Sequence, residues 1–329
     1  MTVLIVTRSD DNESVKMVAE CLRERGGRAF RFDTDRFPAG VRLIAQYGRG
    51  AECLSLSTDE DEVDLREVTA VWHRRLNVAG RLPREMDRQL LMASVGESRA
   101  TVMGLLAALG VFRLDPEHNI RRAEHKQLQL ARAREFGLDT PRTLITNDPR
   151  AVREFAPTCP GGLVVKMLSS FAVYDAEGRE HVVFTNPVAP ADLEDLEGLR
   201  LCPMTFQERV EKALELRATV VGRRVFTAAV DSQASERAAH DWRRDGVGLV
   251  EEWEPYRLPR AVERRLLRLM DSFGLNYGAA DFILTPDGRH VFLEVNPAGE
   301  FFWLERRPGL PISAAIADVL LGRAPRREN

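Results

Sequence analysis

A polar trio inside an apolar hairpin near the C-terminus constrains this chain most. Residues 277–284 and 290–295 each predict a strand, and Thr-Pro-Asp-Gly at 285–288 predicts the turn between them. Asp281 lies on the first strand, while Glu294 and Asn296, two residues apart, face the same side of the second. Buried oxygen-bearing side chains need a partner, and Mg²⁺ prefers such oxygens together with those of phosphates. We predict a magnesium site here; the alternative is an acidic rim facing solvent, which the apolar neighbours disfavour.

Composition narrows the class of protein. The 329 residues are 44% hydrophobic and 29% charged, which is typical of a folded enzyme with two or three packed units. The formal net charge of -3 provides no strong field for nucleic acid or an anionic membrane, so we expect neither as a partner. The 4 cysteines form no Cys-x-x-Cys pair, which favours a reducing cytoplasm. We expect no signal peptide and no apolar run that crosses a bilayer.

The first 115 residues predict an α/β unit. A strand at 3–7, a helix at 13–25 and a strand at 28–32 make a β-α-β opening, which predicts a parallel pair. Further strands are expected at 41–47, 52–56 and 68–73, followed by a helix at 84–109. Leu114-Asp115-Pro116 interrupts the pattern and marks the first boundary.

Two further units are expected, at 116–203 and 204–329. The central one predicts a long helix at 118–136, strands at 143–146 and 162–168, a hairpin pairing 171–174 with 181–186, and a short acidic helix at 191–197. The last one predicts strands at 205–210, 214–221 and 224–230, a helix at 259–273, the polar hairpin and a helix at 312–321. The fold class is therefore α/β with α+β subdomains.

Other residues carry weaker signals of chemistry. Lys166 lies in the buried-looking strand LVVKML, where it needs a counter-charge or a phosphate. The segment around Gln207 could offer backbone groups to an adenine edge, with Glu215 near a ribose and Arg217 near phosphates; an ordinary exposed turn fits equally well. Lys126, on a polar helix, is by itself more typical of a solvated lysine. A P-loop, a Rossmann glycine fingerprint and a GxSxG elbow are all missing from the sequence.

Several motifs, spread over nearly the whole chain, resemble one superfamily: VLIVTRSDD, AVWHRR, HKQLQLARAREFGLDTPRTLIT, GGLVVKMLSS, FQERVEKALELRATVVG and DFILTPDGRHVFLEVNPAGEFFWLE. Together they resemble the ATP-grasp ligases, and more closely the graspetide (microviridin-type) macrocyclases, which cross-link side chains of ribosomally made precursor peptides. The resemblance implies an ATP-grasp fold with an N-terminal parallel-sheet pre-ATP-grasp domain.

The resemblance also implies roles for individual residues. ATP phosphates would contact Lys126 and Lys166; the adenine hinge and ribose would be met by Gln207, Glu208, Val210 and Glu215. Phosphate or an acylphosphate would bind Arg217, and one or two Mg²⁺ ions would bind Asp281, Glu294 and Asn296. The sequence departs from many ATP-grasp enzymes in the loop after the second lysine, which has Ser169 and Ser170 in place of glycines.

For the peptide, the resemblance implies a leader site formed by the hairpin at 171–184 and the following acidic segment. A basic leader residue would pair with Asp192, Glu194 and Asp195, although a plain solvated acidic helix is an equal alternative. Candidates for contact with an acidic core peptide are Arg74, Arg237, His240 and Trp242. A homodimer is also typical of the family.

These expectations combine into an ATP-dependent ligase that forms ω-esters or ω-amides between Asp or Glu and Thr, Ser or Lys side chains through an acylphosphate. One alternative is an ATP-grasp ligase that acts on free amino acids or a protein C-terminus. Another is a nucleotide- or peptide-binding module without catalysis. Because the nucleophile belongs to the peptide, the sequence does not specify ester against amide, ring size or the precursor.

Overall fold

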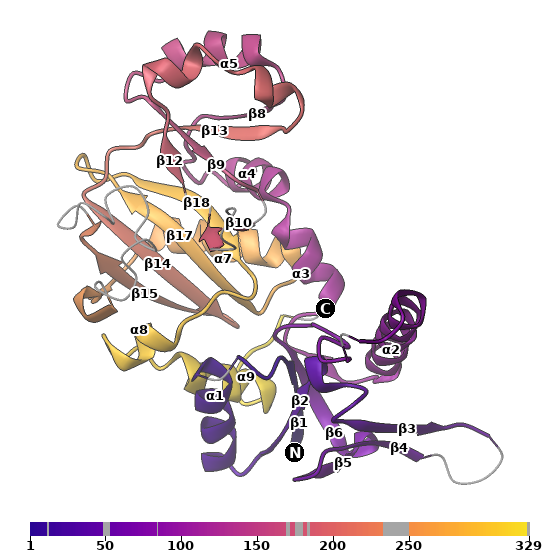
Figure 1. The fold of residues 1–329 in the computed structure, drawn as a ribbon. Coiled ribbons are helices and arrows are strands. Elements are labelled where there is room, and N and C mark those ends of the chain that lie inside the picture. Colours follow the sequence, from indigo (N-terminus) through magenta and orange to yellow (C-terminus); the bar gives the residue numbers. More distant parts are fainter. Residues whose placement is uncertain are drawn as a thin grey trace.

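The described part of the chain forms three sheet-based regions and two smaller sheets (Figure 1). The computed structural model describes residues 1–11, 13–48, 53–83, 85–168, 172–174, 180–182, 185–232 and 250–327. The N-terminal sheet has the order β2-β1-β6-β7 and is parallel throughout, with strands β1 (Thr2–Thr7), β2 (Arg28–Asp33), β6 (Val68–His73) and β7 (Phe112–Arg113). Helix α1 (Glu13–Glu24) makes the first crossover. This confirms the predicted parallel α/β opening.

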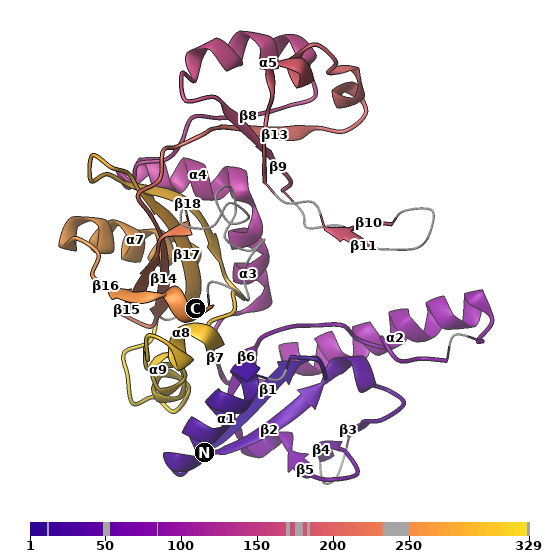
Figure 2. The same ribbon diagram turned by 60° about the vertical axis from the view of Figure 1, so that its left-hand side comes forward.

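Two elements extend from one side of the N-terminal unit (Figure 1). One is an antiparallel sheet of β3 (Arg42–Gln46), β4 (Cys53–Ser57) and the unpredicted β5 (Glu62–Asp64). The other is helix α2 (Arg88–Ala108), whose buried residues, Ser98, Val102, Leu105 and Leu106, all lie in its second half. Leu90 and Val95 are 62% and 37% exposed, because the first turns of α2 run past the domain (Figure 2).

Helix α2 also corrects an expectation about membranes. Its 21 residues have a mean hydropathy of 1.2 over the most apolar window, and it is the one helix in the described part of the chain long and apolar enough to cross a bilayer. By length and composition alone, α2 is thus an exception to the expectation that no apolar run could cross a bilayer. Length and composition alone do not make α2 a membrane segment, and its second half packs into the N-terminal core.

The predicted helix at 118–136 is two helices, α3 (Glu117–Glu124) and α4 (Lys126–Glu135). His125 breaks the helix because its backbone is extended, with ψ of 99°. The break lets both pieces pack against the C-terminal unit, where Ala123 and Ala133 are fully buried.

A small sheet of order β12-β9-β13-β8 forms the central unit, made of β8 (Thr143–Thr146), β9 (Leu163–Lys166), β12 (Asn186–Pro187) and β13 (Met204–Glu208). Helix α5 (Pro149–Phe155), which was not predicted, packs against β8. The predicted hairpin is present as β10 (Ala172–Tyr174) paired with β11 (Glu180–Val182). The acidic segment is not one helix but two 3₁₀ turns, η4 (Pro190–Leu193) and η5 (Glu197–Arg200), because Leu196 and Leu199 turn inward to pack in the small core.

The C-terminal unit is a five-stranded antiparallel sheet of order β16-β15-β14-β17-β18. Its strands are β14 (Leu214–Val221), β15 (Arg224–Val230), β16 (Glu254–Tyr256), β17 (Tyr277–Leu284) and β18 (His290–Asn296). Its helices are α7 (Arg260–Phe273), α8 (Phe302–Arg306) and α9 (Ile312–Leu320). Among the described residues, the other 3₁₀ turns are η1 (Thr34–Arg36), η2 (Leu65–Glu67), η3 (Ala156–Thr158) and η8 (Val250–Glu252).

The N-terminal and C-terminal units share one hydrophobic core. Helix α9 lies against α1 (Figure 1), and residues of both helices and of β1 and β6 belong to the same buried cluster. Strand β13 pairs with β8 and β9, so the sheet places it with the central unit, on the other side of the division proposed at residue 203. The three-way division itself remains a proposal. The shared core makes the N-terminal unit part of the wall next to the polar hairpin.

Candidate functional site

The polar trio converges, as the strand pattern predicts. In the β17–β18 register Asp281 faces Glu294, and a bulge follows Asp281. The Asn296 amide nitrogen lies 3.2 Å from a Glu294 carboxylate oxygen and 3.4 Å from an Asp281 carboxylate oxygen. The Asp281 and Glu294 side chains are 20% and 22% exposed, so the cluster opens to solvent on one side.

Two cations complete this cluster from other elements. Lys126, the first residue of α4, places its Nζ 2.8 Å from a Glu294 oxygen and 3.4 Å from the Asn296 Oδ1. Arg217, on β14 directly opposite Asp281, donates from a terminal nitrogen to Asp281 Oδ1 at 2.6 Å. The resulting site combines two carboxylates, an amide, an ammonium and a guanidinium.

Arg217 is held rigidly in place. Its side chain is only 6% exposed, and its guanidinium lies 5.7 Å from the centre of the Trp303 ring. Burial lowers the pKa of the Arg217 guanidinium, but the neighbouring Asp281 outweighs burial, so the pKa lies above its ordinary value. A permanently charged, pre-oriented arginine suits the binding of an anionic group.

A buried glutamine, missed at the sequence level, fixes the strand between two members of the trio. Gln129 on α4 is 0% exposed. Its amide nitrogen donates to the Val295 carbonyl at 2.8 Å, and its amide oxygen accepts from the Val295 N–H at 2.8 Å. Val295 lies between Glu294 and Asn296, so this amide pair sets how far both side chains project. A polar residue on the buried side of a helix is the signal that could have revealed it.

The donor set fits Mg²⁺. Within the described residues no group of three or more His, Cys, Asp and Glu side chains gathers, so the thiolate or imidazole sites typical of zinc are not formed there. Two carboxylates and an amide oxygen are hard ligands, and a set this small leaves positions for water and phosphate oxygens, which Mg²⁺ favours. Asp281, Glu294 and Asn296 would hold the ion, and Lys126 and Arg217 would face the phosphates beside it.

Comparison with known proteins finds relatives that cover nearly the whole chain. The sequence model for the MvdD pre-ATP grasp domain matches residues 2–121. The structure of the macrocyclase MdnC bound with the precursor peptide MdnA from Microcystis aeruginosa MRC is 48% identical, with a TM-score of 0.87 over 98% of this chain and 100% of that one. A Chryseobacterium gregarium RiPP-associated ATP-grasp ligase, in complex with ADP and a leader and core peptide, is 39% identical, with a TM-score of 0.94 over 100% and 98%.

The chain belongs to the ATP-grasp peptide macrocyclase family. A third relative, the ATP-grasp ligase PsnB, complexed with a phosphomimetic variant of a minimal precursor, Mg and ADP, is 26% identical, with a TM-score of 0.73 over 98% of this chain and 99% of that one. No curated protein matches the sequence. The predicted ATP-grasp fold with an N-terminal pre-ATP-grasp domain is confirmed.

The residues predicted to line the adenine hinge lie at the junction between β13 and β14. Gln207 is 4% exposed and donates from its side chain to the Thr143 hydroxyl at 2.9 Å, so its side chain is engaged within the small sheet. Glu208 and half-buried Val210 flank the segment that joins the two sheets. Glu215, 9% exposed, pairs with Lys212 at 2.8 Å. An adenine edge would therefore meet backbone groups of this segment, which remains a prediction.

Lys166 ends β9 of the small sheet, opposite Thr205, and is half-buried. The two predicted phosphate lysines therefore come from different elements, Lys126 from helix α4 and Lys166 from strand β9 of the small sheet. Ser169 and Ser170 lie outside the described residues, and the role of their loop is untested.

The predicted peptide-binding residues that the structure describes lie on two different units, Arg74 on the N-terminal unit and the three acidic residues on the central unit. Asp192, Glu194 and Asp195 are exposed on the η4–η5 segment, which Arg153 fastens to α5 through the Leu193 and Glu194 carbonyls at 3.1 and 3.2 Å. The three candidates Arg237, His240 and Trp242 lie outside the described residues.

The Arg74 side chain is buried, whereas direct contact with a substrate peptide would need it to be exposed. Its side chain is 1% exposed, and it pairs with Glu300 at 2.6 Å and with Asp11 at 3.4 Å. A direct contact with a core peptide stays a prediction, but the guanidinium is already engaged within the protein.

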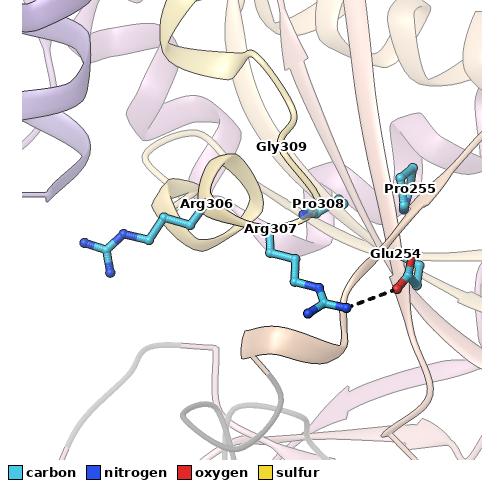
Figure 3. Close-up of a pocket in the computed structure, with 6 residues that line it drawn as sticks. All are labelled: Glu254, Pro255, Arg306, Arg307, Pro308 and Gly309. Carbon is cyan, nitrogen blue, oxygen red and sulfur yellow. Dashed lines mark ion pairs between the residues drawn. The ribbon is translucent and has the colours of Figure 1, made fainter.

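A cavity of about 340 Å³ lies beside α8, lined by Glu254, Pro255, Arg306, Arg307, Pro308 and Gly309 (Figure 3). Arg307 points toward Glu254, 3.7 Å away, while Arg306 points away from it (Figure 3). Both arginines are more than half exposed and both have carboxylate partners, so the cavity adds no group to the cluster around Asp281.

Proposed function

We propose that this chain is an ATP-dependent peptide macrocyclase, an ADP-forming carboxylate ligase that cross-links side chains of a ribosomal precursor peptide. The cross-link is an ω-ester or ω-amide between an Asp or Glu and a Thr, Ser or Lys of the core. The observation that carries the proposal is the cluster of Lys126, Arg217, Asp281, Glu294 and Asn296, which a chain of contacts of 2.6–3.4 Å links together. It supports Mg²⁺-ATP binding in a chain that is 48% identical to a peptide macrocyclase over its full length.

The proposed reaction has two nucleophilic steps. A core carboxylate oxygen attacks the γ-phosphorus of ATP, the bond to the bridging oxygen breaks, and ADP leaves. A hydroxyl or amine then attacks the acyl carbon, the bond to the phosphate oxygen breaks, and phosphate leaves with the proton passing to solvent. Bound Mg²⁺ supplies charge neutralisation on the phosphate oxygens.

The protein's own groups act by position and charge. Lys126 offsets charge on the phosphoryl oxygens, and Arg217, rigid and buried, holds the acylphosphate and its developing oxyanion. Neither residue needs to move a proton. A leader bound away from the reacting groups raises the effective concentration of the core peptide near them.

Mass spectrometry of a cognate precursor with Mg²⁺ and ATP tests this function. We expect loss of one water per cross-link, with one ADP formed for each. Glu294→Gln should abolish cross-linking, whereas Asp287→Asn, in the turn of the same hairpin and 62% exposed, should not. An unchanged precursor mass would refute the proposal. Phosphate release with free amino acids and no peptide would point to the second ligase class, and nucleotide binding without turnover to a binding module.

We propose that the leader peptide binds at the central unit. Asp192, Glu194 and Asp195 are exposed and sit on a segment whose leucines anchor it to the small core, so the carboxylates are available for a basic leader residue. Fluorescence anisotropy of a labelled leader should show weaker binding to the triple variant Asp192→Asn/Glu194→Gln/Asp195→Asn than to the wild type. Equal affinity of wild type and variant would exclude this surface.

We also propose a cytoplasmic homodimer. All 4 cysteines are free thiols, which fits a reducing compartment. Leu90 and Met92 on α2 are 62% and 67% exposed, and Ile44 and Tyr47 on the hairpin that projects beside it are 52% and 64% exposed. A second copy would cover this apolar surface. Light scattering should give a dimer for wild type and for Leu201→Glu, 91% exposed on the central unit, but a monomer for Leu90→Glu/Met92→Lys.

A further inference from the structure

Three side chains donate hydrogen bonds to the loop at residues 298–300, which follows strand β18. Arg74 donates to the Ala298 carbonyl at 2.5 Å and to the Gly299 carbonyl at 3.2 Å. The Tyr277 hydroxyl donates to the same Gly299 carbonyl at 2.6 Å. Arg217 donates to the Glu300 carbonyl at 3.3 Å. The backbone that carries Asn296 into α8 is thus fixed at every carbonyl from residue 298 to residue 300.

The side chain of Glu300 crosses from this loop to the N-terminal unit. Its carboxylate lies 2.6 Å from a terminal nitrogen of Arg74, accepts from the Ser14 hydroxyl at 2.7 Å, and also pairs with Arg75. Arg74 and Arg75 follow β6 and Ser14 belongs to the first turn of α1, so all three donors come from the carboxyl edge of the N-terminal sheet.

Burial makes this contact specific. The Arg74 side chain is 1% exposed and that of Glu300 28% exposed. A buried charge that loses its partner is strongly unfavourable, so Arg74 strongly favours the loop position that delivers Glu300 and the two carbonyls. Asp11 is 3% exposed and lies 3.4 Å from the Arg74 Nε, so it also orients the guanidinium.

We propose that the Glu300 clamp, made of Ser14, Arg74, Arg75 and Glu300, is an interdomain device that positions the metal ligands and Arg217. Arg74 is a positioning residue in this scheme, since it touches the loop and not the reacting groups. The inference rests on the proposed function, because it assigns the trio to Mg²⁺-nucleotide binding. Its consequence is that the N-terminal unit controls metal affinity without contributing a ligand.

The test measures ADP binding by calorimetry as a function of Mg²⁺ concentration, which does not depend on turnover. Glu300→Gln keeps a hydrogen bond to Ser14 but removes the charge. We expect the Mg²⁺ concentration for half-maximal ADP binding to rise about fivefold, at the low end of couplings between sites. At saturating Mg²⁺ the peptide KM should return to near the wild-type value.

Asp318→Asn is the matched control. Its carboxylate pairs with Arg25 at 2.8 Å across the same α1–α9 interface and is 27% exposed, but it does not touch the loop. It should leave the Mg²⁺ dependence unchanged. Arg74→Lys, which keeps the charge but not the forked donor geometry, should also raise the Mg²⁺ requirement, and its combination with Glu300→Gln should be less than additive.

Equal Mg²⁺ dependence of wild type and Glu300→Gln, or an equal rise in Asp318→Asn, would overturn the clamp. Full additivity of the Arg74 and Glu300 changes would overturn it as well. Wild type that binds Mg²⁺-ADP but does not cross-link a cognate precursor would refute the proposed function alone. Wild type that binds no ADP at any Mg²⁺ concentration would refute both.

Discussion

Gln129→Leu isolates the contact by which α4 fixes the metal-binding strand. Leucine is similar in size but removes the amide, so three backbone groups lose their partner: the N–H and carbonyl of Val295 and the carbonyl of Ala123. The site is 0% exposed, so water does not replace the lost hydrogen bonds. Strand β18 is an edge of its sheet, and α4 therefore supplies the pairing that a sixth strand would have supplied.

The magnitude follows from these three groups. Each buried group left without a partner costs at least about 1 kcal/mol, roughly 3 kcal/mol in total. The additional apolar surface of leucine offsets about 1 kcal/mol. We therefore expect the free energy of unfolding to fall by at least about 2 kcal/mol.

Urea unfolding followed by tryptophan fluorescence measures this loss, because Trp253 and Trp303 lie in the core that joins the N- and C-terminal units. Gln127→Leu is the control, since it makes the same change two residues away at an exposed position of the same helix. It should shift the midpoint little. Equal midpoints for the two variants at an unchanged m-value would refute the argument that the Gln129 amide anchors β18.

Three further variants probe the site and its surroundings. Gly299→Ala should weaken Mg²⁺-dependent ADP binding, because the new Cβ would lie 2.9 Å from an Arg217 nitrogen; calorimetry checks this. Lys126→Met should reduce ATP affinity at least tenfold by equilibrium binding, since it removes the charge 2.8 Å from Glu294, and unchanged affinity would exclude a phosphate contact. Burial lowers the pKa of His73, so its stabilising contribution is present above about pH 6.5 and is lost as pH falls below it. His73→Gln should therefore flatten the decline in unfolding free energy between about pH 6.5 and 5, and parallel curves would contradict this.

The C-terminal sheet was the most predictable part of the molecule. The bounds predicted for β14, β15 and β17 agree with the structure, because a turn such as 285–288 sets the register and the period of two then sets the face of every side chain. The convergence of Asp281, Glu294 and Asn296 followed from those two local rules. The bulge after Asp281 did not, since nothing in the local pattern requires an extra residue there.

The predictions that were wrong concern segments whose local structure depends on contacts with residues far away in the sequence. The break at His125 has no Gly or Pro signal, and it forms because α3 and α4 each pack on the C-terminal sheet and α7. The acidic segment at 191–197 has helical composition, yet Leu196 and Leu199 must both reach the small core, which divides it into two turns. In both cases tertiary packing overrides a weak local propensity.

Arg74 shows the same effect at a charged residue, and there it bears on function. The resemblance implies a contact between Arg74 and an acidic core peptide, which needs an exposed side chain, and an arginine is costly to bury unless it is paired. The loop that pairs with Arg74 begins 224 residues further along the chain, at Ala298, and its sequence carries no mark of the contact. Since the loop extends the strand of Glu294 and Asn296, the geometry of the metal site depends on the interface between two units as well as on the residues that hold the ion. Substitutions at that interface can therefore change metal affinity while every ligand stays in place.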